Sequence, residues 1–244
     1  MDRLIYTSMT GAKYLLERQA TLANNLANAT TTGFRADTVG LRAVPAVGPQ
    51  AGTRVFTVET TTGADFSQGP MTATGRTLDV AIQGEGWLAV QSTDGGEAYT
   101  RNGALQVGPD GVLQLPSGLQ VQGSGGSISI PADAQSVLIA ADGTVSVKAA
   151  SSKNPTTVGQ LKLVNPPTSD LVKGTDGLFR TQSGAPAETD AAVKVADGTL
   201  EGSNVNVVEA MVGMIAASRQ FELQMKMLST AEQNEQKAAT VIGA

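Results

Sequence analysis

The period of the hydrophobic pattern changes twice along the chain, and this change constrains the fold more than any other feature. From Leu4 to Leu26, apolar residues recur at alternating steps of three and four, which is the spacing of one helix face. The same spacing returns from Asn204 onward. Between these ends the period is two, as in half-buried strands. We therefore expect an α+β protein with a helix at each end and an all-β middle.

Each terminal pattern forms a narrow, heptad-like row of apolar side chains. The members of the N-terminal row are Ile5, Met9, Ala12, Leu16, Gln19, Ala23 and Leu26, of which Gln19 is the one polar member, and Leu15 and Leu22 lie beside the row. The members of the C-terminal row are Val208, Met211, Met214, Ser218, Phe221, Met225 and Leu228, with Val207, Val212 and Ile215 beside it. Such rows either cover the core of the chain's own β domain or bind neighbouring copies, and the spacing alone leaves both possibilities open.

The patterns divide the chain into four segments. Residues 1–34 are expected to form the N-terminal helix, which ends in the Thr30–Gly33 run because β-branched residues and glycine disfavour helix. Residues 35–77 follow neither period, so we expect an extended connector with one or two short strands, around residues 54–59. Residues 78–198 should form the β domain, whose Asp-Gly pairs suit tight hairpins. Residues 199–244 should form the C-terminal helix, with Ser203 and Asn204 as its cap.

The composition excludes most enzyme classes. The chain contains no cysteine and no histidine, which excludes thiol nucleophiles, Ser-His-Asp arrangements and cysteine-based zinc sites. A net charge of −5 argues against a nucleic-acid partner. The first residues lack the pattern of a signal peptide, and no apolar run approaches the ~18 residues of a membrane-spanning helix. We therefore expect neither a cleaved signal nor direct membrane insertion.

Carboxylates are the remaining candidates for catalysis. Asp79 and Glu85 bracket the end of an expected strand and could pair as the two carboxylates of a glycosidase do. Ordinary turn residues are the favoured interpretation, since one tryptophan and three tyrosines offer little surface for sugar stacking. The Asp-Gly pairs have no fixed period, and the glycine-rich loops lack the Gly-Lys-Ser/Thr ending of a phosphate loop. The sequence therefore predicts no catalytic residue, no metal site and no cofactor.

Three sets of motifs resemble those of the bacterial flagellar rod and hook proteins. Near the N-terminus, Ala23-Asn24-Asn25-Leu26-Ala27-Asn28 is followed by Thr32-Gly33-Phe34-Arg35. The middle contains LDVAIQGEGW at residues 78–87 and YTRNG at residues 99–103. The C-terminal part contains LEGSNV at residues 200–205, then EAM at 209–211 and RQFE at 219–222. The sets occur in the family's order across nearly the whole chain, and residues 1–6 and 97–101 most resemble the proximal-rod branch.

This resemblance implies a structural, non-enzymatic function as a subunit of the flagellar basal-body rod, with a distal-rod or hook-type subunit as the alternative within the family. It implies that the terminal helices pair as a coiled coil in the inner layer of a hollow, torque-transmitting shaft. It also implies uncleaved export by the flagellar type III apparatus to the periplasmic part of the basal body. The implied partners are copies of this chain, other proximal-rod and distal-rod proteins, and the export apparatus.

The subunit interface is expected to include the apolar rows and a few residues beside them. The expected apolar members are Ile5, Met9, Ala12, Leu16, Leu22, Leu26, Phe34, Val208, Met211, Met214, Ile215, Phe221, Met225 and Leu228. Asn24, Asn25 and Asn28 are expected to add interhelical hydrogen bonds that set the register. Two other classes stay open: a polysaccharide-degrading enzyme that uses Asp79 and Glu85, and a binding module whose helices close on its own β domain.

Overall fold

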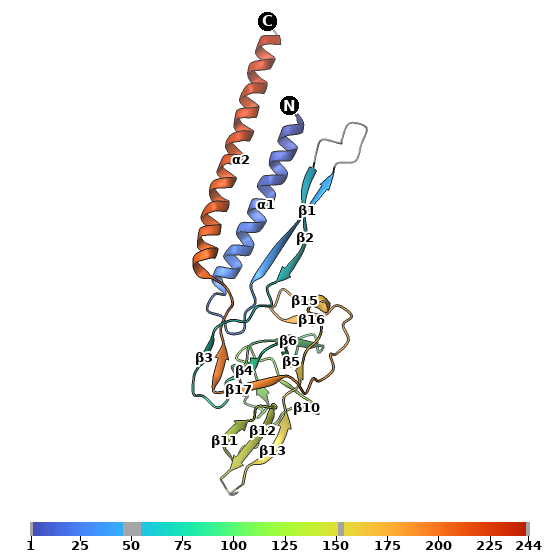
Figure 1. Ribbon diagram of the computed structural model, residues 1–244, viewed down its shortest axis with the longest axis vertical. Helices are drawn as coiled ribbons and strands as arrows, with labels where there is room; N and C mark the ends of the chain where they lie inside the picture. The colour runs from blue at the N-terminus through green and yellow to red at the C-terminus, as the bar shows by residue number, and fades with distance from the viewer. Residues whose placement is uncertain (1, 46–54, 151–153, 243–244) are drawn as a thin grey trace. The chain divides into compact units, whose positions relative to one another are not determined.

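The structure is a computed structural model that describes residues 2–45, 55–150 and 154–242 of the 244-residue chain. A long α-helix lies at each end, and the strands of the described residues lie between the two helices in sequence (Figure 1). The expected α+β class, with a mostly β middle, is confirmed. The chain divides into two compact units, of which the first is Met1–Ala29, Ala36–Asp65 and Val205–Ala244, and the second is Thr30–Arg35 and Phe66–Asn204.

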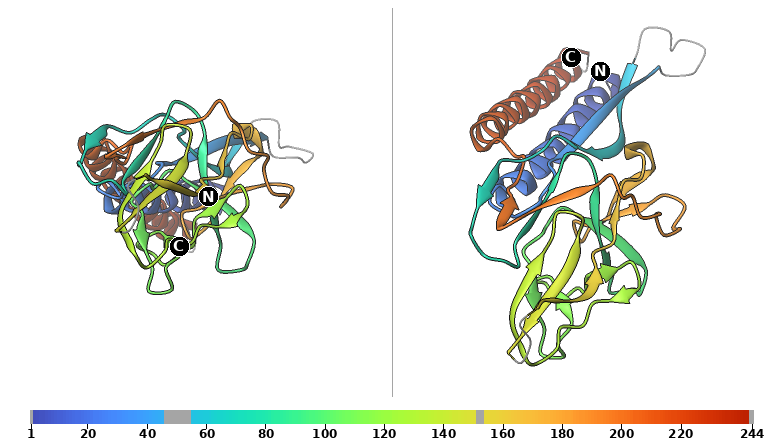
Figure 2. Two further views of the ribbon diagram at one scale, coloured as in Figure 1. Left: turned by 90° about the horizontal axis from the view of Figure 1, so that it is seen from below. Right: turned by 60° about the horizontal axis from the view of Figure 1, so that its bottom comes forward.

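The first unit, called the helical unit below, contains α1 (Asp2–Ala27), α2 (Val207–Ile242) and an antiparallel pair of strands, β1 (Asp37–Pro45) and β2 (Val55–Ala64). Helix α1 packs along α2 and also contacts both strands (Figures 1 and 2). Asn206 caps α2, since its Oδ1 accepts hydrogen bonds from the backbone N–H groups of Val208 (3.1 Å) and Glu209 (3.2 Å). The expected cap at Ser203 and Asn204 is therefore wrong by two residues.

The segment expected to be an extended connector forms this long strand pair instead. Asp37 pairs with Ala64 at one end and Pro45 with Val55 at the other, with an irregularity between Thr38 and Gly40. Valine occurs twice in each strand and threonine four times in β2, and both residue types favour extended backbone. Local periodicity did not reveal the pair, because the two strands are separated in sequence and the pattern of one strand does not show which other strand it pairs with. Residues 46–54, which join the two strands, lie outside the described residues.

The second unit, called the β unit below, is built from small antiparallel sheets. A five-stranded sheet has the order β14-β5-β6-β16-β15, and a three-stranded sheet has the order β11-β12-β13. Four two-stranded sheets pair β3 with β18, β4 with β17, β7 with β8 and β9 with β10. The strands of the five-stranded sheet are β5 (Trp87–Gln91), β6 (Glu97–Thr100), β14 (Leu163–Val164), β15 (Leu171–Lys173) and β16 (Phe179–Thr181). The 3-10 turn η1 (Thr168–Asp170) precedes β15.

The other strands of the β unit complete this arrangement. They are β3 (Met71–Ala73), β4 (Val80–Gln83), β7 (Gln106–Val107), β8 (Leu113–Gln114), β9 (Gln122–Gly123), β10 (Gly126–Ser127), β11 (Ala134–Ile139), β12 (Thr144–Ala149), β13 (Thr156–Gln160), β17 (Lys194–Asp197) and β18 (Thr199–Glu201). The β structure thus begins before residue 78, the boundary expected from the sequence. Pairing of β3 with β18 and of β4 with β17 joins the beginning of the unit to its end.

The core of the β unit consists of aliphatic side chains from these sheets, with Val90, Leu105, Leu113, Val121 and Val145 fully buried. An aromatic group lies beside them: the ring centroids of Trp87 and Phe179 are 4.5 Å apart, and Phe66 lies 6.0 Å from Trp87. Four of the Asp-Gly pairs lie in hairpin turns, as expected, whereas Asp197-Gly198 joins β17 to β18, which pair with other strands. The glycine of every pair has positive φ. These glycines are Gly95, Gly111, Gly143, Gly177 and Gly198.

Candidate assembly interface

The face of α2 that packs on α1 is lined by small residues. Its buried members are Ala210, Ala217 and Ala231, and Met214, Phe221 and Leu228 lie half-buried between them. With the half-buried Gln224, which lies between Phe221 and Leu228, these residues repeat in steps of four and three, as a heptad pattern does. They are called the inner row below. Gly213 allows a close approach, because a Cβ atom there would lie 3.2 Å from Leu22 Cδ1.

On α1, the residues that face inward are Ala12 and Leu15, which are buried, and Leu22, which is half-buried. Gly11 lies opposite Gln224, whose Nε2 would be 3.5 Å from an added Cβ atom. Met9 and Leu16, two members of the expected row, are 56% and 51% exposed. The inward face of α1 therefore includes Ala12 of the row expected from the sequence but continues through Leu15 and Leu22, which lie beside that row. The side chain of Ile5 lies outside the described residues.

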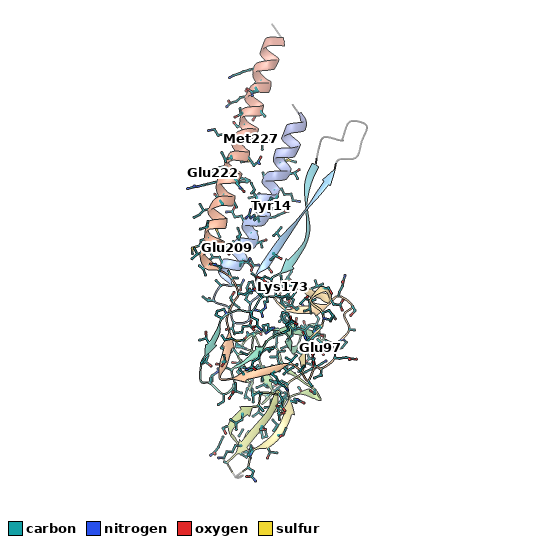
Figure 3. The ribbon with its side chains drawn as sticks, in the orientation of Figure 1. Tyr14, Glu97, Lys173, Glu209, Glu222 and Met227 are labelled. Atoms are coloured by element: carbon teal, nitrogen blue, oxygen red, sulfur yellow. The ribbon has the colours of Figure 1, made fainter. Side chains whose placement is uncertain are left out.

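A second apolar face on α2 points away from α1. It consists of Val208, Met211, Val212 and Ile215, whose exposed fractions are 71%, 48%, 61% and 57%. At about 100° per residue, these positions lie opposite the inner row. They are called the outer patch below. Beyond the patch this side of the helix becomes charged, and Glu222 lies on it, away from α1 (Figure 3).

The expected C-terminal row therefore divides between two faces. Met214, Phe221 and Leu228 belong to the inner row, whereas Val208, Met211 and Ile215 belong to the outer patch. Met225 is also exposed, at 47%. Steps of three and four fit both faces, and the sequence pattern favoured the larger side chains. In the structure it is the alanines that take the buried positions.

The asparagines expected to join helices form hydrogen bonds within the chain. The amide of Asn25 donates to the carbonyl oxygen of Asp37 at 2.9 Å and accepts from its backbone N–H at 2.7 Å, which ties the end of α1 to the start of β1. Asn25 is buried. Asn28 Nδ2 donates to the carbonyl and side-chain oxygens of Asn24, at 3.0 and 2.8 Å. Asn25 therefore fixes the helical unit itself, because both ends of its side-chain amide are used there.

Phe34 is held in the β unit. The ammonium group of Lys173 lies 3.9 Å from the centroid of its ring, and the same group donates a hydrogen bond to the carbonyl oxygen of Arg35 at 2.7 Å. The backbone N–H of Asn204 donates to the carbonyl oxygen of Phe34 at 3.3 Å. Leu26, an expected member of the interface, is half-buried in the helical unit.

The β unit also contains a buried charged cluster that periodicity could not predict. One oxygen of Glu201 pairs with Arg35 Nη2 at 2.7 Å, and the other pairs with Arg101 Nη1 at 3.1 Å. The side chains of Arg35 and Glu201 are 0% exposed, and that of Arg101 is 4% exposed. All three residues lie in the motifs quoted above. The motifs mark these positions, but their meeting depends on chain segments that are far apart in sequence.

Two guanidinium groups share the single carboxylate of this cluster. Burial lowers the pKa of Arg101 below its usual value, the charge of Glu201 opposes this shift, and the nearby charge of Arg35 adds to it. Arg101 Nη2 donates to the carbonyl oxygen of Gly84 at 2.7 Å, and its guanidinium lies 5.5 Å from the Trp87 ring centroid. Arg35 Nε, Arg35 Nη1 and Arg101 Nε have no hydrogen-bond partner within the described structure.

The two carboxylates considered for catalysis have different surroundings. Asp79 is buried: its Oδ1 accepts from Arg76 Nε at 2.9 Å, and its Oδ2 accepts from the hydroxyl of Thr74 at 2.7 Å. Glu85 is exposed in the turn after β4. Because both oxygens of Asp79 are bonded locally, the structure favours a turn-stabilising role for it. Within the described ranges, no acidic cluster has the arrangement of a metal site, and neither helix is long and apolar enough to span a bilayer.

Models of three protein families match successive parts of the chain. The family described as "Flagella basal body rod protein" matches residues 5–35. The family described as "Flagellar hook protein FlgE/F/G D1 domain" matches residues 81–147, and "Flagellar basal body rod FlgEFG protein C-terminal" matches residues 196–241. Each matched segment contributes one member of the charged cluster, namely Arg35, Arg101 and Glu201 in turn.

Curated proteins match along almost the whole chain. The flagellar basal-body rod protein FlgF of Salmonella typhimurium is 46% identical over 246 residues, covering 98% of this chain and 97% of that protein. FlgF of Escherichia coli K12 is 47% identical over the same length and coverage. A rod protein FlgG, from Buchnera aphidicola, is 34% identical over 257 residues and 96% of this chain. On this full-length similarity, the chain belongs to the family of flagellar basal-body rod proteins, on its FlgF branch, and is a structural subunit of that rod.

Proposed function

We propose that this rod subunit is a component of the proximal rod and that it assembles through its two terminal helices, which pack with those of neighbouring subunits as coiled coils. The resulting hollow shaft transmits torque in the periplasmic part of the basal body. Its partners are copies of this chain and other proximal-rod and distal-rod proteins. The chain reaches the rod through the flagellar type III export apparatus, without a cleaved signal peptide.

The observation that carries this proposal is the outer patch of α2. Four large apolar side chains stand together on the side of the helix that faces away from α1, and each is at least 48% exposed. Burying each of them would contribute about 1.5 kcal/mol, or about 6 kcal/mol in all, before the entropic cost of association. In the monomer these side chains stay in water and contribute no burial energy. A neighbouring helix that covers the patch removes them from water and so stabilises the assembly.

A second exposed surface supports a repeating contact. Met9 and Leu16 lie seven residues apart, so both project from the same side of α1, and each is more than half exposed. The outer patch lies on the other helix. Two different surfaces on one subunit fit a head-to-tail contact between copies, which continues into a helical assembly instead of closing as a dimer.

The proposed interface keeps the residues expected from the sequence that are exposed and adds Val212, while Phe34 packs against Lys173 within the β unit. Val208, Met211 and Ile215 join Val212 in the outer patch, and Met9, Leu16 and Met225 offer further exposed apolar area. Ala12, Leu22, Leu26, Met214, Phe221 and Leu228 act through the packing of α1 on α2, and Ile5 stays a prediction. Asn24 and Asn28 stay candidates for contacts between subunits, whereas Asn25 acts within its own chain.

Replacing Val212 with glutamate tests the interface. A carboxylate in the centre of the outer patch cannot be buried without a large desolvation cost, so we expect Val212→Glu to abolish rod incorporation and swimming. The matched control is Val172→Glu, because Val172 is also exposed (49%) but lies on strand β15 of the β unit. The measurements are motility in soft agar and the presence of each variant in purified basal bodies.

Both variants should keep the circular dichroism spectrum and thermal midpoint of the unchanged purified chain, because both positions are exposed. Loss of assembly for Val212→Glu alone supports the proposal. Normal swimming with Val212→Glu would contradict it, as would an equal loss with Val172→Glu.

A further inference from the structure

The backbone enters or leaves the β unit at three places, and the segments at these places, called passages below, all contact or contain one residue, Glu201. The segment Thr30–Arg35 enters and leaves the unit, the chain returns at Phe66, and it leaves again after Asn204. Glu201 lies just before this last exit. It contacts the first passage at Gly33 and Arg35, the second passage at Gly69, and the interior of the unit at Arg101.

These contacts use both the backbone and the carboxylate of Glu201. The backbone N–H of Gly33 donates to its carbonyl oxygen at 2.8 Å, and Arg35 pairs with Oε1 at 2.7 Å. The N–H of Gly69 donates to the same Oε1 at 3.0 Å. Arg101, from the interior, holds Oε2. One side chain therefore connects the passages at residues 33–35 and 66–69 to the body of the unit.

Close backbone packing surrounds this point. A Cβ atom at Gly33 would lie 2.3 Å from the carbonyl carbon of Arg101, and one at Gly69 would lie 2.2 Å from the carbonyl oxygen of Gly202. Gly202 N–H donates to the carbonyl oxygen of Pro70 at 2.8 Å. The passages are therefore in backbone contact with one another and with the rest of the β unit, and there is no room for a side chain between them.

The charge balance argues that the cluster is not there for stability alone. Two buried guanidinium groups face one carboxylate. Four of their nitrogens have no hydrogen-bond partner within the described structure, although one of the four, Arg35 Nη2, forms the ion pair with Glu201. Burying charge in this way has a desolvation cost that a well-packed apolar group would avoid. What the charged groups provide instead is directional attachment, because a carboxylate can hold two cations and a backbone N–H at the same time.

We propose that Glu201 is the mechanical anchor of the β unit, the residue that keeps the entering and leaving segments attached when force acts on them. This inference rests on the proposed torque-transmitting function. Force that arrives along the segment at residues 30–35 meets the Gly33–Glu201 backbone hydrogen bond and then the Arg35–Glu201 pair. Arg101 then passes this force from Glu201 to Ile82 and Gly84, whose carbonyl oxygens accept hydrogen bonds from its guanidinium.

Single-molecule pulling on the full chain tests the anchor. The sequence has no cysteine, so two introduced cysteines give unique attachment points for the pulling handles. The pair Thr30→Cys and Ser117→Cys places the anchor in the path of the force. The pair Ser117→Cys and Ser183→Cys, at two exposed positions within the β unit, leaves the anchor outside that path. The lifetime before the first rupture at constant force is measured in both geometries.

Two variants should weaken the anchor. Glu201→Gln removes the charge that holds both arginines, and Arg35→Met removes the link to the first passage but leaves the Glu201–Arg101 pair intact. We expect each to shorten the rupture lifetime between residues 30 and 117 about 10-fold or more, as for the loss of one charge-assisted hydrogen bond. Arg35→Met should not change the lifetime between residues 117 and 183, and it should leave the thermal midpoint of the β unit nearly unchanged.

The matched control is Glu97→Gln. Glu97 pairs with Lys162 at 2.6 Å and is 10% exposed, but this pair does not hold any of the passages. The 30–117 lifetime should therefore stay within about twofold for this variant, on the same scale of hydrogen-bond loss. If Glu201→Gln does not fold, Arg35→Met decides the question.

Unchanged 30–117 lifetimes in the anchor variants would overturn the proposal, and so would equal shortening by Arg35→Met in both geometries. The pulling experiment measures the mechanical lifetime of one isolated chain, whereas the Val212→Glu experiment measures incorporation into the rod. Failure of the anchor and failure of the proposed interface are therefore separate results.

Discussion

Gly33 meets two demands that exclude any other residue type. Its φ is +68°, a conformation that L side chains rarely adopt, and an added Cβ atom would lie 2.3 Å from the backbone of Arg101. Gly75 meets only the first demand: its φ is +71°, but no atom lies within 4 Å of its would-be Cβ position. Substitution of Gly75 therefore tests backbone strain alone, whereas substitution of Gly33 tests backbone strain together with a steric clash.

We predict that Gly33→Ala destabilises the β unit more than Gly75→Ala does. Strain in the left-handed region should cost about 1–2 kcal/mol at either position. Overpacking against Arg101 should add about 1–3 kcal/mol at Gly33, for a total of about 2–5 kcal/mol. Urea unfolding followed by the fluorescence of Trp87, the single tryptophan, measures both free energies of unfolding. Equal losses at the two positions would mean that the close approach of Gly33 to Arg101 is absent in solution.

Tyr99 makes the β unit sensitive to alkaline pH. Its side chain is 1% exposed, and its hydroxyl oxygen accepts a hydrogen bond from the N–H of Ala187 at 2.7 Å. Burial raises its pKa from 10.0 to about 12; the Ala187 hydrogen bond lowers it, and the nearby Glu97 raises it further. Because the folded state favours the neutral phenol, this stabilisation is complete below pH 10 and is lost as pH rises towards 12.

Tyr99→Phe should therefore flatten the alkaline limb of the stability curve. Between pH 10 and 12, the free energy of unfolding of the unchanged chain should fall more steeply than that of the variant, since the variant has no phenol to ionise at this position. Loss of the acceptor for Ala187 N–H lowers the variant's stability at every pH and leaves the difference in slope intact. Parallel curves across this window would contradict the prediction.

At the scale of elements, helix α2 keeps its smallest side chains inside and several large ones outside. Its buried residues are alanines, whereas the outer patch consists of valine, methionine and isoleucine. A buried methyl group contributes about 0.8 kcal/mol, and a buried large aliphatic side chain about 1.5–3 kcal/mol. The pairing of α1 with α2 in one chain therefore gains less apolar burial than a neighbour could add. This imbalance is the physical reason to expect the helical unit to be completed by assembly.

Hydrogen exchange on the purified chain should show this imbalance. We expect the amides of α1 and α2 to exchange faster than those of β5 and β6, whose buried residues include Leu88, Val90 and Ala98 at 0–2% exposure. In rods or rod fragments the helical amides should become protected. Helices as protected as the central strands in the isolated chain would favour a self-contained module and contradict assembly by the outer patch.

For the whole molecule, the two units have different tasks. The helical unit packs α1 along α2 and carries the outer patch together with the exposed Met9 and Leu16. The β unit contains the large aliphatic core, and its first and last strands pair with each other through β3 with β18 and β4 with β17. A folded β unit can therefore precede assembly, while the helical unit supplies the contacts.

The secondary structure at the two ends, the β middle and the turns could be predicted from the sequence because each depends on residues that are close together in the chain. The helices at Leu4–Leu26 and after Asn204, the β middle and the Asp-Gly turns each depend on residues a few positions apart. The motif at residues 23–35 and its counterparts near residues 100 and 201 also identified the family before any contact was known. Local spacing and short motifs were sufficient for these predictions.

Only the tertiary structure decided which faces are covered. The apolar steps of α2 fit two faces equally well, and the packing of α1 selected the alanines at positions 210, 217 and 231. It likewise paired β1 with β2 and placed Arg35 and Arg101 on the two oxygens of Glu201. The hydrophobic periodicity of a segment indicates its secondary structure, but it does not indicate which distant segment packs against it. That choice comes from the joint burial and pairing of residues far apart in the chain, which no single segment encodes.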